Sequence, residues 1–100
     1  MSDIYAVRIT PQALSDLEGI CKFVSGRSEM NAPKLIEKLL RSIDGLELFP
    51  HRFNVPRTGY VRGRQIRSMP APPYLVRYRI DDRRKAVFIL RIRHGARRRP

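Results

Sequence analysis

The sequence has 100 residues, which fits one domain spanning residues 1–100 and excludes a second sizeable core. Hydrophobic residues make up 42% of the chain, but no apolar stretch approaches the roughly 18 residues of a membrane helix and the N-terminus lacks a signal pattern, so we expect a folded cytoplasmic protein that engages no membrane. A formal net charge of +12 predicts an anionic partner.

The first half of the chain predicts one strand followed by two helices. Residues 4–9 are rich in β-branched and aromatic side chains and predict a strand. Apolar residues at three- and four-residue steps then predict a helix over about 11–25, with Thr10 as its N-cap. A second apolar stripe predicts another helix that starts near Asn31 and closes near Phe49. Two helices with a short connector indicate an antiparallel helical hairpin.

The second half predicts a loop and three strands. Residues 51–60 contain a proline, a glycine and scattered polar residues and predict the loop. Strand-like runs follow over about 61–69, 74–80 and 86–93, and a polar turn of hairpin length joins the last two. The element order is therefore β-α-α-β-β-β. Grouped helices and grouped strands predict an α+β domain in which the helical hairpin packs on one face of a largely antiparallel sheet.

The positive charge is concentrated in the second half of the chain. Residues 1–50 carry 6 basic and 7 acidic residues, whereas residues 51–100 carry 15 basic and 2 acidic ones. Of the 21 basic residues 17 are arginine, whose planar guanidinium binds phosphate and carboxylate groups through two parallel hydrogen bonds. A genome rich in G and C also favours arginine codons. Composition alone therefore leaves two causes of the arginine excess open, an anionic partner and codon usage.

Alternation along the last two strands sorts these arginines, because successive strand residues point to opposite faces of a sheet. The apolar positions form two rows, Tyr74, Val76, Tyr78 and Ile80 in one strand and Phe88, Leu90 and Ile92 in the other. If both rows face the helices, the helix-free face collects Arg77, Arg79, Arg91 and Arg93. Adjacent arginines repel one another, so we interpret this face as a site for a target or an anion. The alternative is the ordinary solvated face of an antiparallel sheet.

Few residues form a recognisable catalytic pattern. The single cysteine, Cys21, excludes an internal disulfide and a cysteine-rich zinc site, and no phosphate-binding glycine loop is present in the sequence. We therefore expect no metal and no cofactor. One residue remains a candidate for catalysis. His94 lies just past the last strand, and imidazole is the side chain most often used as a general acid or base. A surface or capping role fits its position equally well.

Three segments resemble the RelE/ParE superfamily of bacterial toxins. They are the opening strand and helix, from Tyr5 to Ile20 with Thr10-Pro11 between them, the run YLVRYRI at 74–80, and the run VFILRIRHGAR at 87–97. The resemblance covers essentially the whole chain. It implies the toxin component of a type II toxin–antitoxin system and, as its partner, a small, acidic, partly disordered antitoxin that wraps around the toxin and neutralises it.

The superfamily divides by activity, and RelE-like members cut messenger RNA on the ribosome. Arg67 and Arg97 match arginines that those enzymes use to stabilise the phosphate. Their lysines have no counterpart at the roughly aligned Thr58 and Tyr60, and their C-terminal tyrosine would fall beyond the last residue. If the protein is a ribonuclease, the resemblance therefore leaves three candidate catalytic residues: His94 as the base, and Arg67 and Arg97 to stabilise the phosphate.

ParE-like members share the scaffold without the nuclease residues and inhibit DNA gyrase, and this chain looks closer to them. The resemblance thus implies a toxin that is not an enzyme and arrests growth through gyrase, with ribosome-dependent cleavage of messenger RNA as the alternative. A basic nucleic-acid-binding module without toxicity is a third, more remote reading. In the gyrase reading, the arginines of the sheet and the C-terminal run Arg97, Arg98 and Arg99 hold the target.

Overall fold

The structure, a computed structural model, describes residues 4–27, 32–53, 60–61 and 63–95. Helices and strands follow one another in nearly the predicted order. They are β1 (Ala6–Ile9), α1 (Pro11–Arg27), α2 (Ala32–Asp44), the short 3₁₀ turns η1 (Gly45–Glu47) and η2 (Pro50–Arg52), β2 (Tyr60–Val61), β3 (Arg64–Gln65), β4 (Arg67–Ala71), β5 (Tyr74–Asp81) and β6 (Ala86–His94).

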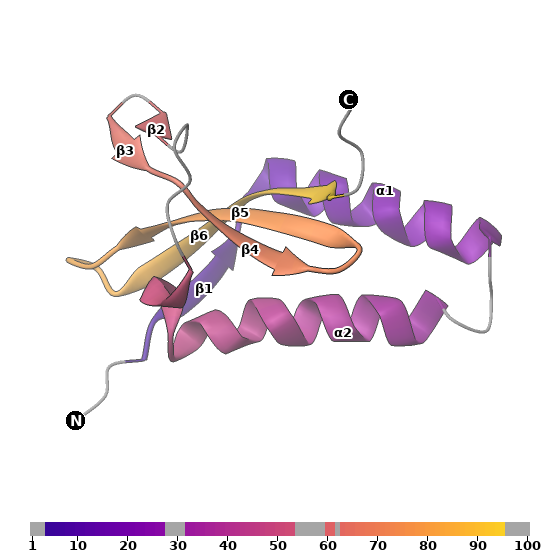
Figure 1. Ribbon diagram of the computed structural model, residues 1–100, viewed down its shortest axis with the longest axis horizontal. Helices are drawn as coiled ribbons and strands as arrows, with labels where there is room; N and C mark the ends of the chain where they lie inside the picture. Colours follow the sequence, from indigo (N-terminus) through magenta and orange to yellow (C-terminus); the bar gives the residue numbers. More distant parts are fainter. Residues whose placement is uncertain (1–3, 28–31, 54–59, 62, 96–100) are drawn as a thin grey trace.

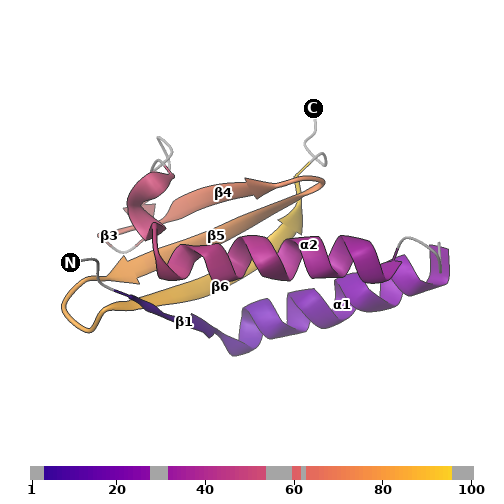
Figure 2. The same cartoon turned by 90° about the horizontal axis from the view of Figure 1, so that it is seen from below.

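Four of the strands form one sheet in the order β1-β6-β5-β4. Strands β4, β5 and β6 pair antiparallel, whereas β1 pairs parallel with β6. Helices α1 and α2 lie side by side on the same face of this sheet (Figures 1 and 2). The predicted α+β fold, a helical hairpin on one face of a largely antiparallel sheet, is therefore confirmed. Within the described residues, no helix combines the length and hydropathy needed to cross a membrane.

Thr10 ties the start of α1 to the sheet. Its side-chain oxygen accepts a hydrogen bond from the Ala13 N–H over 3.3 Å, as expected of an N-cap, and its hydroxyl donates to the Ile89 carbonyl over 2.7 Å. Helix α1 then runs to Arg27, two residues past the predicted end. The predicted cap at Asn31 lies outside the described residues.

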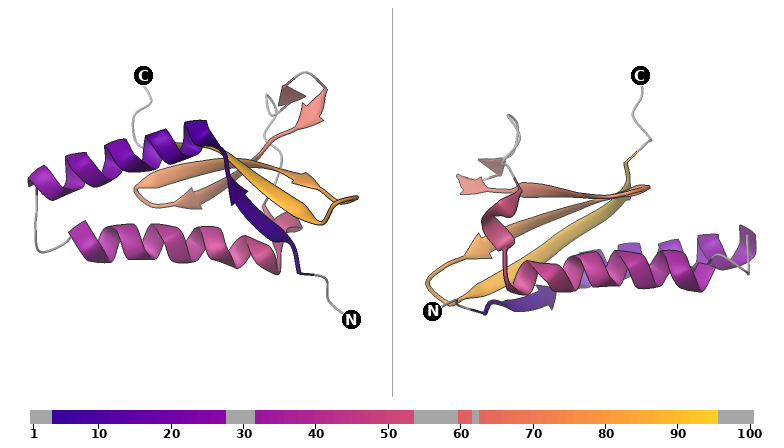
Figure 3. Two further views of the ribbon diagram at one scale, coloured as in Figure 1. Left: turned by 180° about the vertical axis from the view of Figure 1, so that it is seen from behind. Right: turned by 60° about the horizontal axis from the view of Figure 1, so that its bottom comes forward.

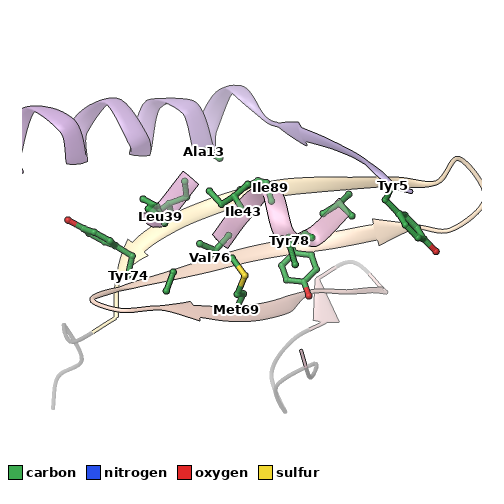
Figure 4. Packing of buried hydrophobic residues seen from close by; sticks show 13 residues of the cluster. Tyr5, Ala13, Leu39, Ile43, Met69, Tyr74, Val76, Tyr78 and Ile89 are labelled. Carbon is green, nitrogen blue, oxygen red and sulfur yellow. The ribbon is translucent and has the colours of Figure 1, made fainter. Parts of the chain in front are cut away.

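The helical hairpin packs on one face of the sheet (Figure 3), and the hydrophobic core lies between the two (Figure 4). Helix α2 contributes Leu39 and Ile43, and Leu46 follows from η1, each at most 2% exposed. The sheet contributes buried residues from three strands, Met69, Ala71, Tyr74, Val76, Tyr78, Val87, Ile89 and Ile92. Helix α2 itself ends at Asp44, earlier than predicted, because η1 tightens the chain into a 3₁₀ turn while keeping the apolar stripe buried.

The single strand predicted over about 61–69 is wrong. Gly63 adopts a φ of +80°, a left-handed conformation that suits glycine, and the chain turns back there. Strands β2 and β3 on either side of this turn pair with each other in a separate two-stranded sheet. Only β4 joins the main sheet from this region, and the β2–β3 pair extends beyond it (Figure 1).

Strands β5 and β6 are paired with a β-bulge. Tyr78 pairs with Ile89, but the neighbouring Arg77 pairs with Arg91, so Leu90 is an extra residue in β6. One inserted residue moves the following side chains to the other face of the sheet. The strict alternation assumed from the sequence therefore fails at this point.

The bulge changes which side chains of β6 face the helices. Val87 and Ile89 are fully buried in the core, whereas Phe88, between them, points to the opposite face. After the bulge, Ile92 is again buried in the core. The expectation that Phe88 and Leu90 line the helix side together with Ile92 is therefore wrong for the first two residues.

Candidate functional site

The face of the sheet opposite the helices, which we call the open face, carries most of the arginines of the sheet. Val76 and Ile92 pair with each other and are buried in the core, so the adjacent pair, Arg77 and Arg91, points away from it. The next pairs on the same face are Arg79 with Phe88 and Leu75 with Arg93. The structure thus brings together the four arginines that the sequence predicts on the helix-free face, Arg77, Arg79, Arg91 and Arg93.

These four arginines differ in how available they are. Arg77 and Arg93 are exposed, and within the described parts of the chain neither makes an ion pair. Arg79 is half-buried, and its guanidinium carbon lies 4.5 Å from the centre of the Phe88 ring, a cation–π contact that holds it against the sheet. The row therefore consists of two exposed cations, Arg93 and Arg77, followed along the sheet by Arg79, which is stacked on an aromatic ring.

Arg91 is the exception, because its guanidinium is bound to Asp16 of α1. Its Nε donates to Oδ2 over 2.9 Å and its Nη2 donates to Oδ1 over 3.3 Å. The same carboxylate accepts the Ile92 N–H over 2.9 Å. Burial alone raises the pKa of Asp16, but the hydrogen bonds from Arg91 and Ile92 outweigh it and hold the pKa below its usual value. The carboxylate is therefore charged at neutral pH.

One arginine of the open face was missed from the sequence. Arg8 of β1 pairs with Phe88 in the parallel register and is exposed. Neighbouring residues in register point to the same face, so Arg8 extends the arginine row across β6 to the edge of the sheet. Alternation within residues 4–9 carried the signal, but only the pairing of β1 with β6 reveals which face Arg8 shares.

His94 lies on the other side of the sheet. It pairs with the buried Tyr74, and the two rings pack edge to face with centroids 5.7 Å apart. His94 also borders a largely apolar groove of about 680 Å³ between α1 and the end of β6. This α1–β6 groove is lined by Ser15, Asp16, Gly19, Ile20, Phe23, Tyr74, Ile92 and His94.

Arg67 and His94, the two described candidates for ribonuclease chemistry, are not neighbours. Arg67 pairs with Tyr78 on the β4 side of β5, whereas His94 pairs with Tyr74 on the β6 side. Four residues along a strand span about 13 Å, and two strand spacings add about 10 Å across the sheet. Arg67 also donates a hydrogen bond from Nη1 to the Phe53 carbonyl over 2.6 Å, so its guanidinium already has a partner within the fold.

A polar hollow of about 360 Å³ lies at the end of β5 next to β3. Arg67 and Arg79 both line it, together with His51, Arg64, Gln65, Ile80, Asp81 and Asp82. Its acidic groups already have partners, since Asp82 accepts a hydrogen bond from the Tyr5 hydroxyl over 2.6 Å and lies 3.1 Å from His51. The tyrosine hydrogen bond, opposed by burial, lowers the pKa of Asp82. This cluster joins the β5–β6 turn to η2 and to Tyr5, the residue just before β1.

The helical hairpin carries a second apolar groove on its surface. This α1–α2 groove, of about 520 Å³, is lined by Cys21, Pro33, Ile36, Glu37, Leu40, Arg41 and Asp44. Its floor is apolar, and its rim includes the ion pair between Arg41 and Glu37. Cys21 is half-buried there, close to the buried position that the helix pattern predicts.

The remaining candidate residues, Arg97, Arg98 and Arg99, lie outside the described residues, as does Thr58. Taken together, the described surfaces provide binding geometry on both sides of the sheet: an arginine row on one, and apolar grooves beside the helices on the other. The fold and these surfaces define a small, basic α+β domain with an arginine-rich face and apolar surface grooves.

Comparison with known proteins gives this domain its family. The family of ParE toxins of type II toxin–antitoxin systems, parDE, matches residues 7–99. The chain belongs to this family of toxins. No curated protein sequence is similar enough to count as a relative.

Solved structures agree with this fold. The chromosomal ParDE system from P. aeruginosa superposes with a TM-score of 0.73 at 20% identity, over 91% of this chain and 96% of that one. The RelBE2 toxin–antitoxin complex from Mycobacterium tuberculosis superposes with a TM-score of 0.68 at 27% sequence identity, over 92% of each chain. The archaeal RelE–RelB complex from Pyrococcus horikoshii superposes with a TM-score of 0.65 at 19% sequence identity, over 95% of this chain and 99% of that one. The superfamily expected from the sequence is thereby confirmed.

Proposed function

We propose that this ParE-family toxin arrests growth by binding DNA gyrase and not by cutting messenger RNA. The separation of Arg67 from His94 carries the proposal. Cleavage of RNA needs a base for the 2′-hydroxyl and a cation for the phosphate at one reacting centre. These two residues lie on strands two apart and about four residues apart along the sheet, and Arg67 is bound to the Phe53 carbonyl.

The open face supports a binding role for the toxin. Arg8, Arg77 and Arg93 are exposed on it, and Arg79 is stacked on Phe88. Such a row holds an anionic or mixed surface without needing any group to transfer a proton. The cationic run Arg97, Arg98 and Arg99 begins three residues after the end of β6 in the sequence, and we propose that it adds to the same contact.

A cognate antitoxin is the second partner we propose, in keeping with the toxin–antitoxin complexes among the similar structures. Its acidic character follows from the charge of residues 51–100, which carry 15 basic and 2 acidic residues. An apolar helix of the antitoxin fits the α1–α2 groove beside Ile36 and Leu40, and an acidic segment fits the open face. A disordered chain that orders on binding can cover both surfaces at once.

The experiment that tests the gyrase proposal uses purified components. The toxin is incubated with gyrase, ATP and supercoiled plasmid, and broken DNA is measured after detergent and protease treatment. We expect linear DNA to accumulate with the wild-type toxin and to fall at least several-fold with Arg77→Ala. Arg83→Ala is the matched control, because Arg83 is an exposed arginine of the β5–β6 turn and not of the sheet. Arg83→Ala is expected to retain activity.

The ribonuclease reading is the competing outcome of that experiment. The similarity to the RelBE2 structure, at 27% identity, is the observation in its favour. If the toxin leaves gyrase and plasmid unaffected but cuts messenger RNA on purified ribosomes, the gyrase proposal is wrong. Cleavage that vanishes in His94→Gln would then assign the base.

A further inference from the structure

The pairing of Arg77 with Arg91 places two cations directly opposite each other on neighbouring strands. Like charges in such positions destabilise a sheet, because their side chains lie within a few ångströms of each other on one face. Arg77 is exposed and has no ionic partner among the described residues. The structure relieves the repulsion at Arg91, whose guanidinium turns to the edge of the sheet and binds Asp16.

The position of Asp16 follows from the way β1 ends. Strand β1 pairs with β6 only as far as Ile89, so the outer edge of β6 beyond that residue is left to α1. There the carboxylate accepts the Ile92 N–H over 2.9 Å, which fixes it at the edge independently of Arg91. The Asp16 side chain is only 17% exposed, and that of Arg91 is 34% exposed. The acid is therefore held in place by backbone, and the arginine is drawn to it.

We propose that Asp16 is a positioning residue that withholds Arg91 from the open face, so that the phosphate backbone of duplex DNA meets Arg77, Arg79 and Arg93 but not Arg91. This inference rests on the proposed function, in which the open face contacts the target, here the DNA that gyrase holds. Phosphate is the ligand class because arginine predominates on this face, and Asp81, the one acid of the described sheet that shares the face, lies at the end of β5 and accepts the Arg84 N–H over 3.2 Å. Neutralising Asp16 releases one further cation to the DNA.

Binding of the purified toxin to a 20-base-pair duplex as a function of NaCl concentration tests this inference without gyrase. Each arginine that neutralises a phosphate steepens the plot of log Kobs against log salt by about 0.9. Asp16→Asn keeps an oxygen for the Ile92 N–H but loses the charge that holds Arg91. We expect the slope of this variant to be steeper than that of the wild type by about 0.9. Lowering NaCl from 1 M to 0.1 M should then strengthen DNA binding about 8-fold more for the variant than for the wild type.

Matched variants separate this effect from a general change of charge. Glu18→Gln removes the same charge from an exposed position on the same helix and is expected to leave the slope unchanged. The double variant Asp16→Asn with Arg91→Ala replaces the ion pair with a neutral pair and is expected to return the slope to the wild-type value. A merely structural role for Asp16 would change the melting temperature and leave the slope alone.

A second measurement keeps the inference testable if Asp16→Asn does not fold. Arg77→Ala is expected to reduce the slope by about 0.9, whereas Arg91→Gln is expected to preserve it, because Arg91 makes no phosphate contact in the wild type. Equal losses from these two variants would overturn the inference, as would a wild-type toxin that does not bind the duplex at 50 mM NaCl. If Asp16→Asn bound an acidic antitoxin more tightly but the DNA duplex no more tightly, the ligand of the open face would be a protein, and the inference would also be overturned. Failure of gyrase poisoning alone leaves these slopes unaffected.

Discussion

The hydroxyl of Tyr78 donates a hydrogen bond to the backbone carbonyl of Pro50 over 2.5 Å, deep in the core. This bond joins the middle of β5 to η2, 28 residues earlier in the chain. Burial raises the pKa of Tyr78 to about 12, although nearby Arg67 opposes the shift. The phenol therefore stays protonated in the folded toxin at a pH where an unfolded tyrosine ionises.

We predict that Tyr78→Phe lowers the free energy of unfolding by about 1–3 kcal/mol at pH 8, because it leaves the buried Pro50 carbonyl without its donor. Since the folded pKa is raised, the contribution of Tyr78 is complete below pH 10 and is lost as pH rises toward 12. The difference between wild type and variant should shrink by about 1 kcal/mol between pH 8 and pH 11. Urea unfolding at both pH values measures it, and a constant difference contradicts the role of this phenol.

Asp16 should show the opposite pH dependence. Its folded pKa is lowered, so its stabilising contribution is present above the unfolded value near 3.8 and is lost as pH falls through the folded value. We expect Asp16→Ala to cost about 1–3 kcal/mol at pH 7, and Asp16→Asn less, because asparagine still accepts the Ile92 N–H. Thermal unfolding at pH 7 and in acid tests this. A deficit of Asp16→Ala that persists undiminished below the folded pKa would rule out the ion pair as its source.

Leu39 and Leu40 are adjacent on α2 and have opposite surroundings. Leu39 is 2% exposed in the core, whereas Leu40 is 36% exposed in the α1–α2 groove. Leu39→Ala should therefore lose about 2–5 kcal/mol of stability. Leu40→Ala should lose less than about 1 kcal/mol. Equal losses in chemical denaturation would mean that the described face of α2 is not the one that packs on the sheet.

The antitoxin proposal predicts a specific defect in the α1–α2 groove. Leu40→Asp places a charge on its apolar floor and should weaken antitoxin binding at least tenfold while leaving the fold intact. Leu48→Asp is the matched control, because Leu48 is 49% exposed and does not line either helical groove. Isothermal titration with the purified antitoxin gives the two affinities. Equal affinities for both variants would place the antitoxin elsewhere on the toxin.

His94→Gln should remain toxic, because the proposed inhibition of gyrase requires no proton transfer at this residue. Glutamine keeps hydrogen-bonding groups but cannot act as a general base near neutral pH. Growth after induction of the variant in cells lacking the antitoxin measures this. A variant that is folded, binds antitoxin and has lost toxicity would instead assign His94 a chemical role.

Periodicity was enough to predict the helices and the layer arrangement, because Leu39 and Ile43 repeat with the period of a buried helix face. It was not enough for β6, where the extra Leu90 changes the alternation without any local sequence signal such as glycine. The partnership of Asp16 with Arg91 joins residues 75 positions apart and was likewise invisible. The face of the sheet on which these arginines lie was thus predictable from local patterns, whereas the ion pairs that they form depend on tertiary contacts.

Whether this ParE-family chain acts on gyrase, as we propose, can be decided from the order of events after its induction. Cells expressing the toxin without antitoxin are sampled over the first minutes for DNA breaks and for messenger RNA cut at ribosomal A sites. We predict that DNA breaks come first, that they depend on Arg77, and that messenger RNA stays intact until growth has stopped. Early messenger RNA cleavage in cells with unbroken DNA would show that gyrase is not the target.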